Sequence, residues 1–201
     1  IMGIVATASE GNTSYPQIPV GMHNARCVRV IDLGTQKQEF SGEVSYKRQV
    51  LIIWEVPEQV HNDEPMTISK FYTLSLHEKS NLGADLSSWR GRAFTEKEKQ
   101  GFDLVNVLNV PCTLNIIEGN NGKSKVANVL PLASKEELPE QHHQEIYFSI
   151  EDYQQGNKET FNQLSEGIRN IILRSKELEG TSVDMGDENN GASLGDEAVP
   201  F

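Results

Sequence analysis

The segment from Arg48 to Val56, which is rich in β-branched and other apolar residues, is the strongest strand signal of this 201-residue chain and constrains its fold more than any other feature. Successive side chains of a strand point to opposite faces. One face therefore holds Arg48, Val50, Ile52, Trp54 and Val56, and the other holds Gln49, Leu51, Ile53 and Glu55. The segment 66–76 alternates in the same way, and 25–33 is rich in Val, Ile and Cys. These runs predict three strands, with a polar loop over 34–46 and a turn over 57–65 between them.

The hydrophobic period changes after residue 79. Leu82, Leu86 and Trp89 recur at i, i+4 and i+7, which is one face of a helix that Ser80 can cap. A capping-box pattern at 95–98 predicts a second short helix, and an acid at position 103 can cap a third. Strands are predicted again over 112–118 and 124–132, joined by a turn at Gly119-Asn-Asn-Gly122.

The order of three strands, a helical region and two strands is that of an OB-fold, a five-stranded Greek-key barrel. We therefore predict a mostly β protein, with the barrel at 19–133, short helices between strands 3 and 4, and a flexible arm at 1–18. An extended tether and an amphipathic helix are expected at 134–179, followed by a disordered acidic tail at 180–201. The stripe that indicates the helix is Phe161, Leu164, Ile168, Ile171 and Ile172. We expect this helix to pack on the barrel; a partner-binding or oligomerising helix is the alternative.

The net charge of −11 is concentrated toward the C-terminal end. Residues 19–132 carry 13 Lys and Arg against 13 Asp and Glu, whereas 133–182 carry 5 against 10. A neutral central domain can still present one basic face to a polyanion. No run of about 18 apolar residues predicts a membrane span, and the first residues lack the pattern of a signal peptide. Cys27 and Cys112 stand in apolar stretches without metal-ligand spacing, so we expect two reduced core thiols in a cytoplasmic protein.

Residues 70–94 interleave aromatic and basic side chains. Binding of single strands uses that mixture, because cations neutralise phosphates while aromatic faces stack on unpaired bases. Phe71 shares its strand face with small polar residues and is the predicted stacking platform, whereas Tyr72, Trp54 and Trp89 are expected in the core. In the loop between the first two strands, Lys37, Phe40, Tyr46 and Lys47 can line an OB binding groove. The predicted nucleic-acid-binding residues are Tyr46, Lys47, Lys70, Phe71, Lys79, Arg90, Arg92, Lys123 and Lys125. The last two lie on a hairpin that either touches the nucleic-acid backbone or is merely solvated.

Other motifs do not indicate catalysis or a cofactor. Gly119-Asn-Asn-Gly122-Lys123-Ser124 lacks the spacing and the following helix of a phosphate-binding loop. His142 and His143 lack further ligands at metal-site spacing, so solvated histidines are expected. Neither paired carboxylates nor a nucleophile elbow singles itself out, although a nuclease could assemble acids from distant positions. We predict no enzyme, no cofactor and no metal.

The tail contains five acids without Lys or Arg between 180 and 201, and then ends on Val199-Pro200-Phe201. An acidic tether with a terminal apolar hook resembles the C-terminal tail of bacterial single-stranded DNA-binding proteins, although here Ala198-Val199 precede Pro200 and only two acids adjoin them. This resemblance implies that Asp196, Glu197, Pro200 and Phe201 recruit a partner enzyme. The alternative is an acidic terminus without a partner.

Further segments resemble phage-encoded single-stranded DNA-binding proteins with an OB-fold. They are Val30-Ile-Asp-Leu-Gly-Thr35, Ile53-Trp-Glu-Val56, Tyr72-Thr-Leu-Ser-Leu-His-Glu-Lys-Ser-Asn-Leu82, Ser88-Trp-Arg-Gly-Arg92 and Phe94-Thr95, within residues 19–175. The resemblance implies a protein that coats single-stranded DNA during replication, recombination and repair in an infected cell. The tail would recruit a recombinase, polymerase or helicase. An OB-fold scaffold module without nucleic-acid binding is the alternative function, and homo-oligomerisation stays open.

Overall fold

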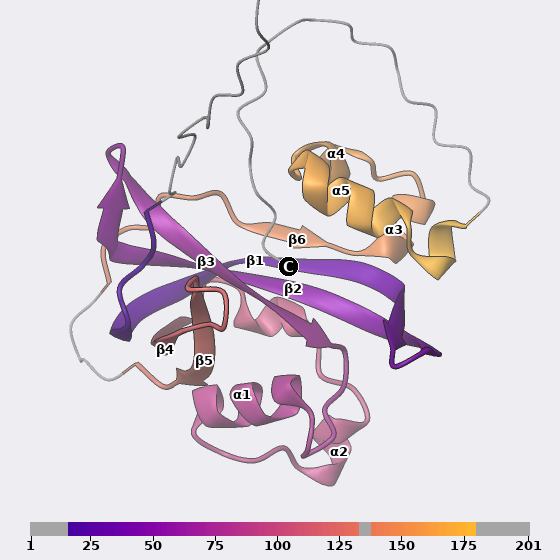
Figure 1. Cartoon of the computed structure of the whole chain (residues 1–201), viewed down its shortest axis with the longest axis horizontal. Coiled ribbons are helices and arrows are strands. Elements are labelled where there is room, and N and C mark those ends of the chain that lie inside the picture. The colour runs from indigo at the N-terminus through magenta and orange to yellow at the C-terminus, as the bar shows by residue number, and fades with distance from the viewer. Residues whose placement is uncertain (1–15, 133–137, 180–201) are drawn as a thin grey trace, which may run out of the picture.

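The computed structural model describes residues 16–132 and 138–179. They form a mostly β protein, with one six-stranded open sheet and a few short helices (Figure 1). The strands are β1 (Gly21–Phe40), β2 (Glu43–His61), β3 (Glu64–Thr73), β4 (Pro111–Glu118), β5 (Ser124–Leu130) and β6 (Ile146–Phe148). The α-helices are α1 (Asn81–Arg90), α2 (Glu96–Lys99), α3 (Ile150–Gln154), α4 (Glu159–Asn162) and α5 (Glu166–Leu173), and the 3₁₀ helices are η1 (Leu104–Val107) and η2 (Lys176–Leu178).

The strand order in the sheet is β3-β2-β1-β4-β5, with antiparallel neighbours. The central strand β1 pairs first with β4, from Gly21 to Arg26, and then with β6, which runs parallel to it at 29–31. β3 and β5 are the edge strands of this order, and no backbone ladder between them is present among the described residues. The Lys70 ammonium of β3 nevertheless donates to the carbonyl of Ala127 in β5, at 3.0 Å.

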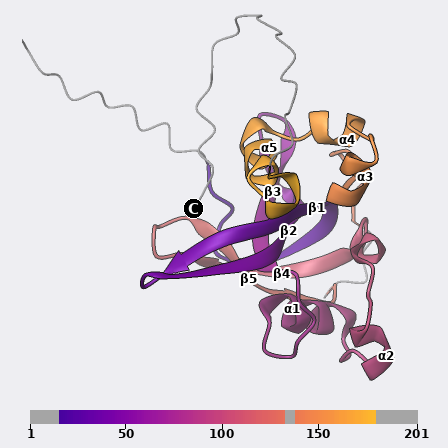
Figure 2. The same ribbon diagram turned by 90° about the vertical axis from the view of Figure 1, so that its right-hand side faces the viewer.

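Helices lie on both faces of the sheet (Figure 2), and a separate hydrophobic core packs on each face. One core contains Trp54 and the α1 side chains Leu82, Leu86 and Trp89. The other packs Leu51, Ile53 and neighbouring β1 side chains against β6 and the helices α3 to α5. β2 is apolar on both faces and therefore contributes to both cores. The two sets of alternate side chains predicted from its sequence lie in different cores.

The sequence prediction of a polar loop over 34–46 is wrong. This segment belongs to β1 and β2, which continue as a two-stranded ribbon up to the pair Phe40 and Glu43. The connecting residues Ser41 and Gly42 both have positive φ, 50° and 81°, as the tight turn of a hairpin requires. The ribbon could not be predicted from the sequence because both of its faces are exposed to solvent over most of its length. Its residues therefore do not alternate between apolar and polar.

The turn predicted over 57–65 is also mostly strand. β2 continues to His61, and the chain reverses at Asn62 and Asp63, which again have positive φ values of 52° and 64°. The pairing register shifts between Val56 and Val60, so a bulge interrupts the alternation there.

The predicted helix signals are confirmed. The Ser80 hydroxyl caps α1 by accepting from the Gly83 N–H at 3.1 Å. Thr95 and Glu98 form both halves of a capping box at α2, and Asp103 caps η1, which is a 3₁₀ turn. The predicted hairpin turn at 119–122 joins β4 and β5.

The apolar stripe at 161–172 packs on the sheet of its own chain, as expected. It differs from the prediction in being divided between α4 and α5, with a break before Ser165, the N-cap of α5. Phe161, Leu164 and Ile172 are buried in the second core.

Cys27 and Cys112 are free thiols inside the first core, as predicted. Burial raises the pKa of both. Ile18, at the end of the predicted N-terminal arm, is also buried in this core, whereas residues 1–15 lie outside the described residues. Among the described helices, none has the length and apolarity needed to cross a membrane.

Candidate nucleic-acid interface

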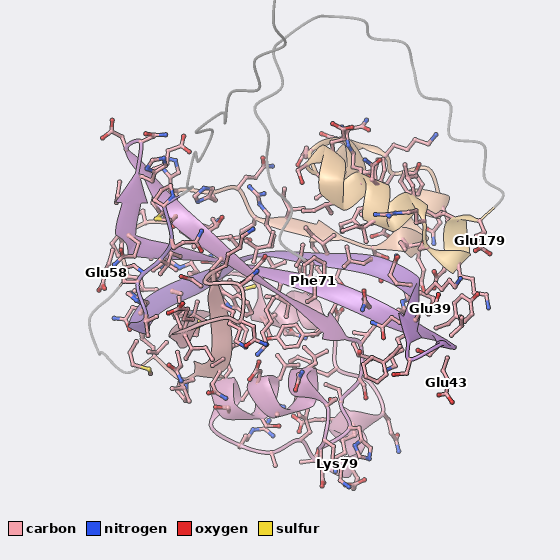
Figure 3. The ribbon with its side chains drawn as sticks, in the orientation of Figure 1. Glu39, Glu43, Glu58, Phe71, Lys79 and Glu179 are labelled. Atoms are coloured by element: carbon pink, nitrogen blue, oxygen red, sulfur yellow. The ribbon has the colours of Figure 1, made fainter. Side chains whose placement is uncertain are left out.

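The outward face of β3 presents one aromatic ring among small polar side chains. Phe71 is 39% exposed and lies on this face with Thr67, Ser69 and Thr73 (Figure 3). Its neighbour across the ladder is the buried Leu51, so the ring borders the second core. The ring is therefore accessible, and its role as a stacking platform stays a prediction.

The other aromatic side chains of this region are buried, as the alternation predicted. Tyr72 is 2% exposed and donates its hydroxyl to Asp85 at 2.8 Å. Its pKa is raised by burial and by the Asp85 charge. Trp54 and Trp89 lie in the first core with ring centroids 6.2 Å apart. None of these three rings is available to a base.

Lys70 has a structural partner. Its ammonium lies 2.7 Å from the Asp85 carboxylate of α1 while it also bonds to β5. The side chain is 19% exposed and ties three elements together. Contact with a phosphate would require giving up these bonds.

Arg90 and Arg92 both bind Glu98, an acid that the sequence alone did not connect to them. Arg90 donates at 2.5 Å, and Arg92 donates to both carboxylate oxygens at 2.7 and 2.9 Å. The Arg90 guanidinium also stacks 4.3 Å from the centroid of the Phe94 ring. Hydrogen bonds from Arg92, from the Thr95 backbone and from Arg90 hold the pKa of Glu98 far below its usual range. This cluster braces the corner between α1 and α2, and only Arg92 keeps an exposed side chain.

Tyr46 and Lys47 lie on the exposed ribbon, where Lys37 is the partner of Tyr46 across the ladder. The ammonium of Lys176 in η2 lies 4.3 Å from the centroid of the Tyr46 ring. Phe40, at the end of the ribbon, is 84% exposed. Lys176 was missed from the sequence because only tertiary packing brings it to the ribbon.

Lys79, Lys123 and Lys125 form no ion pair within the described ranges. Lys125 is exposed on β5, the strand that the Lys70 side chain joins to β3. Lys79 precedes α1 and lies well away from Phe71 in Figure 3. The structure therefore spreads the predicted residues over β3, the ribbon, the α1–α2 corner and the β4–β5 hairpin. The predicted partner residues Asp196, Glu197, Pro200 and Phe201 lie outside the described residues.

The expectation of two solvated histidines is wrong for His143. Its ring Nδ1 and its backbone N–H both lie 2.7 Å from the carboxylate of Glu55, whose side chain is 1% exposed. The backbone N–H of His142 also donates to this carboxylate, at 3.2 Å. Burial alone would raise the pKa of Glu55, but these hydrogen bonds lower it below its usual value. The contact fixes the start of the C-terminal layer on the sheet.

A cleft of about 210 Å³ lies where β1 and β2 meet η1 and β6. Its charged lining includes the ion pair of Arg48 with Asp32, at 2.6 Å, and Asp103, which accepts from the Tyr147 hydroxyl at 3.1 Å. Burial and Asp103 raise the pKa of Tyr147 to about 12. Groups of three or more His, Cys, Asp or Glu side chains suited to a metal ion are absent from the described part of the chain.

A scan against models of known protein families and a search of curated proteins found no match to this chain.

Proposed function

We propose that this protein binds single-stranded DNA on the outer face of β3, within an OB-fold. The strand order β3-β2-β1-β4-β5, with α1 between β3 and β4, supports this fold. The bond from Lys70 to Ala127 supports closure of the barrel by side chains, because it draws the two end strands together.

The exposed Phe71 ring carries this proposal. A ring on an otherwise polar strand face can stack on a base of any sequence, which is worth about 1–3 kcal/mol per base. The proposed phosphate contacts on the sheet are Lys47 of β2, Lys125 of β5 and Lys123 just before β5. Lys79 and Arg92, which flank the two ends of α1, are further proposed contacts. Lys70 and Arg90 are better assigned to holding the fold, because both side chains are largely buried against acids.

In the same proposal, the chain coats and protects single strands during phage replication, recombination and repair in the host cytoplasm. The tail residues Asp196, Glu197, Pro200 and Phe201 recruit a recombinase, polymerase or helicase. Deleting Pro200 and Phe201 is then expected to leave DNA affinity intact and to remove recruitment. The protein binds DNA without catalysing a reaction, so magnesium-dependent loss of labelled DNA would contradict this function.

The direct test is fluorescence anisotropy of a labelled single-stranded oligonucleotide at low and moderate salt, with duplex DNA as competitor. Phe71→Ala should weaken binding about 5- to 150-fold, which corresponds to one lost stacking contact. Val105→Ala is the control, because Val105 is 44% exposed on η1 and is not among the predicted nucleic-acid-binding residues. Equal effects of the two variants, or no binding by the unmodified protein at low salt, would overturn the proposal and favour the scaffold function.

A further inference from the structure

The ribbon leaves an edge of β2 without a strand partner. The ladder between β2 and β3 ends at Gln49 and Thr73, and the Leu74 N–H donates to the Arg48 carbonyl just beyond it. From Lys47 back to Glu43, no strand among residues 16–132 and 138–179 pairs with this edge. An open edge of this kind is a template for another strand.

The backbone groups along this edge follow from the antiparallel geometry. Phe40 and Glu43 close a tight hairpin, so the polar backbone groups of Glu43, Ser45 and Lys47 point toward β1. Those of Val44 and Tyr46 point outward, in step with the Arg48 carbonyl that Leu74 uses. Any added antiparallel strand must therefore form its hydrogen bonds with Val44 and Tyr46.

We propose that a second copy of this chain pairs with this edge, antiparallel, around a twofold axis through Ser45. Val44 of each copy then exchanges backbone hydrogen bonds with Tyr46 of the other. On the opposite face, Glu43 of each copy lies across from Lys47 of the other, which forms two symmetric pairs of opposite charge. The edge thus identifies a second copy of the chain as its partner. When the segment 43–47 pairs antiparallel with itself around Ser45, each Glu43 lies opposite a Lys47.

Neighbouring registers lack this complementarity. Sliding the second copy by one residue would set inward-pointing backbone groups against outward-pointing ones. A slide by two residues places Tyr46 against Tyr46 and Lys47 against Ser45, or Val44 against Val44 and Glu43 against Ser45. Only the register centred on Ser45 sets the acid opposite the base.

The outer edge of β1 in the same ribbon is less accessible. The backbone N–H of Thr35, which points to this edge, donates to Glu177 of η2 at 2.7 Å. The side chain of Gln36 donates to the carbonyl of Ile171 at the end of α5. The C-terminal layer thus borders the β1 edge, whereas Figures 1 and 3 show the turn of the ribbon, with Glu43, projecting at one end of the molecule.

The expected dimer is weak and depends on concentration, because five residues per copy form a small contact. In this dimer Lys47 is paired with an acid, so the proposed phosphate contacts are Lys79, Arg92, Lys123 and Lys125. Its formation does not depend on DNA binding, and the two proposals can fail separately.

Disulfide trapping of the full chain tests the register. Residues facing each other in a non-hydrogen-bonded antiparallel pair have Cα atoms about 4.5 Å apart, within disulfide range. Ser45→Cys should therefore form a cross-linked dimer under mild oxidation, and the native thiols are buried and should not interfere. Gln38→Cys is the control. If two copies paired antiparallel through their β1 edges around Gln38, this residue would lie on the twofold axis and its thiols would cross-link instead. Cross-linking of Gln38→Cys, of both variants alike, or of neither would overturn the proposal.

Charge reversal provides an independent test by sedimentation velocity over a concentration series. Glu43→Lys and Lys47→Glu should each weaken the dimer about tenfold or more, since each creates two like-charged pairs. The double variant Glu43→Lys/Lys47→Glu should restore it. A monomer at every concentration for the unmodified chain, or a double variant no better than either single one, would refute the proposed pairing.

Discussion

Replacing Glu55 by alanine is expected to detach the C-terminal layer from the sheet. The carboxylate of this side chain, which is 1% exposed, accepts from the backbone N–H groups of His142 and His143 and from the His143 ring. Alanine would leave these donors without their acceptor. Because the first residues of the layer are held there, their loss should propagate to β6, which pairs with β1 a few residues further on.

The magnitude follows from the number and type of bonds. Leaving a buried hydrogen-bond donor without its acceptor costs about 1–3 kcal/mol, so loss of the backbone bonds from His142 and His143 is expected to cost about 2–6 kcal/mol, a large share of a total stability of about 5–15 kcal/mol. Glu55→Gln keeps one acceptor oxygen and should cost less, about 1–3 kcal/mol. Glu58→Ala is the control, because Glu58 lies three residues further along the same strand and is exposed, at the left side of the molecule in Figure 3.

Urea denaturation and hydrogen exchange together test this prediction. Glu55→Ala should lower the midpoint, and amide exchange at 142–148 should accelerate more than exchange in the β1–β4 ladder. If Glu55→Ala costs no more than Glu58→Ala, the Glu55 contact does not hold the C-terminal layer on the sheet.

The same contact predicts a pH dependence. Because the folded-state pKa of Glu55 is lowered, its stabilisation is present above the unfolded pKa of about 4.3 and is lost as pH falls through the folded value. The difference in the free energy of unfolding between the unmodified protein and Glu55→Gln should therefore become smaller below about pH 4. A difference that grows on acidification would contradict this account.

Three further predictions concern the core, a helix cap and the cations. Ile172→Ala should cost about 2–5 kcal/mol in urea denaturation, because the side chain is fully buried, and a cost below about 1 kcal/mol would mean that α5 packs loosely. Ser80→Ala should cost about 1 kcal/mol through loss of the cap of α1, and an unchanged midpoint would argue against that cap. Lys125→Gln should reduce the salt slope of single-strand binding by about 0.7 without changing the melting temperature, whereas Lys70→Gln should lower the melting temperature through its lost bond to Asp85. If Lys125→Gln instead lowered the melting temperature and Lys70→Gln reduced the salt slope, Lys70 would be the DNA-binding lysine and Lys125 the structural one.

Much of the fold could be predicted because local signals agreed with it. The alternation through β2, the cap at Ser80 and the capping box at Thr95 each depend on neighbours in sequence, and each is present in the structure. The ribbon was missed since its polar residues carry no alternation, although backbone pairing alone makes it a hairpin.

The candidate site was harder to predict because cations look alike in a sequence. Lys70 and Lys125 both read as free ammonium groups, and only the structure shows that Asp85 occupies the first. Glu55 read as an ordinary polar residue on a strand face, because its partners at 142–143 are far away in sequence. The exposure of Phe71 could be predicted because its polar neighbours on one strand face are a local pattern, whereas its role as a stacking platform stays a prediction.

The two-sided burial of β2 has a consequence for how the chain is made. All five strands of the antiparallel path have been synthesised once Leu130 emerges, but α5, the last α-helix of the layer that shares the second core with Leu51 and Ile53, ends at Leu173. At about 5–20 residues per second, those roughly 40 residues take about 2 to 9 seconds, during which an apolar sheet face has no cover. The nascent protein is therefore most vulnerable to aggregation late in translation, after its sheet can form and before its last helices arrive.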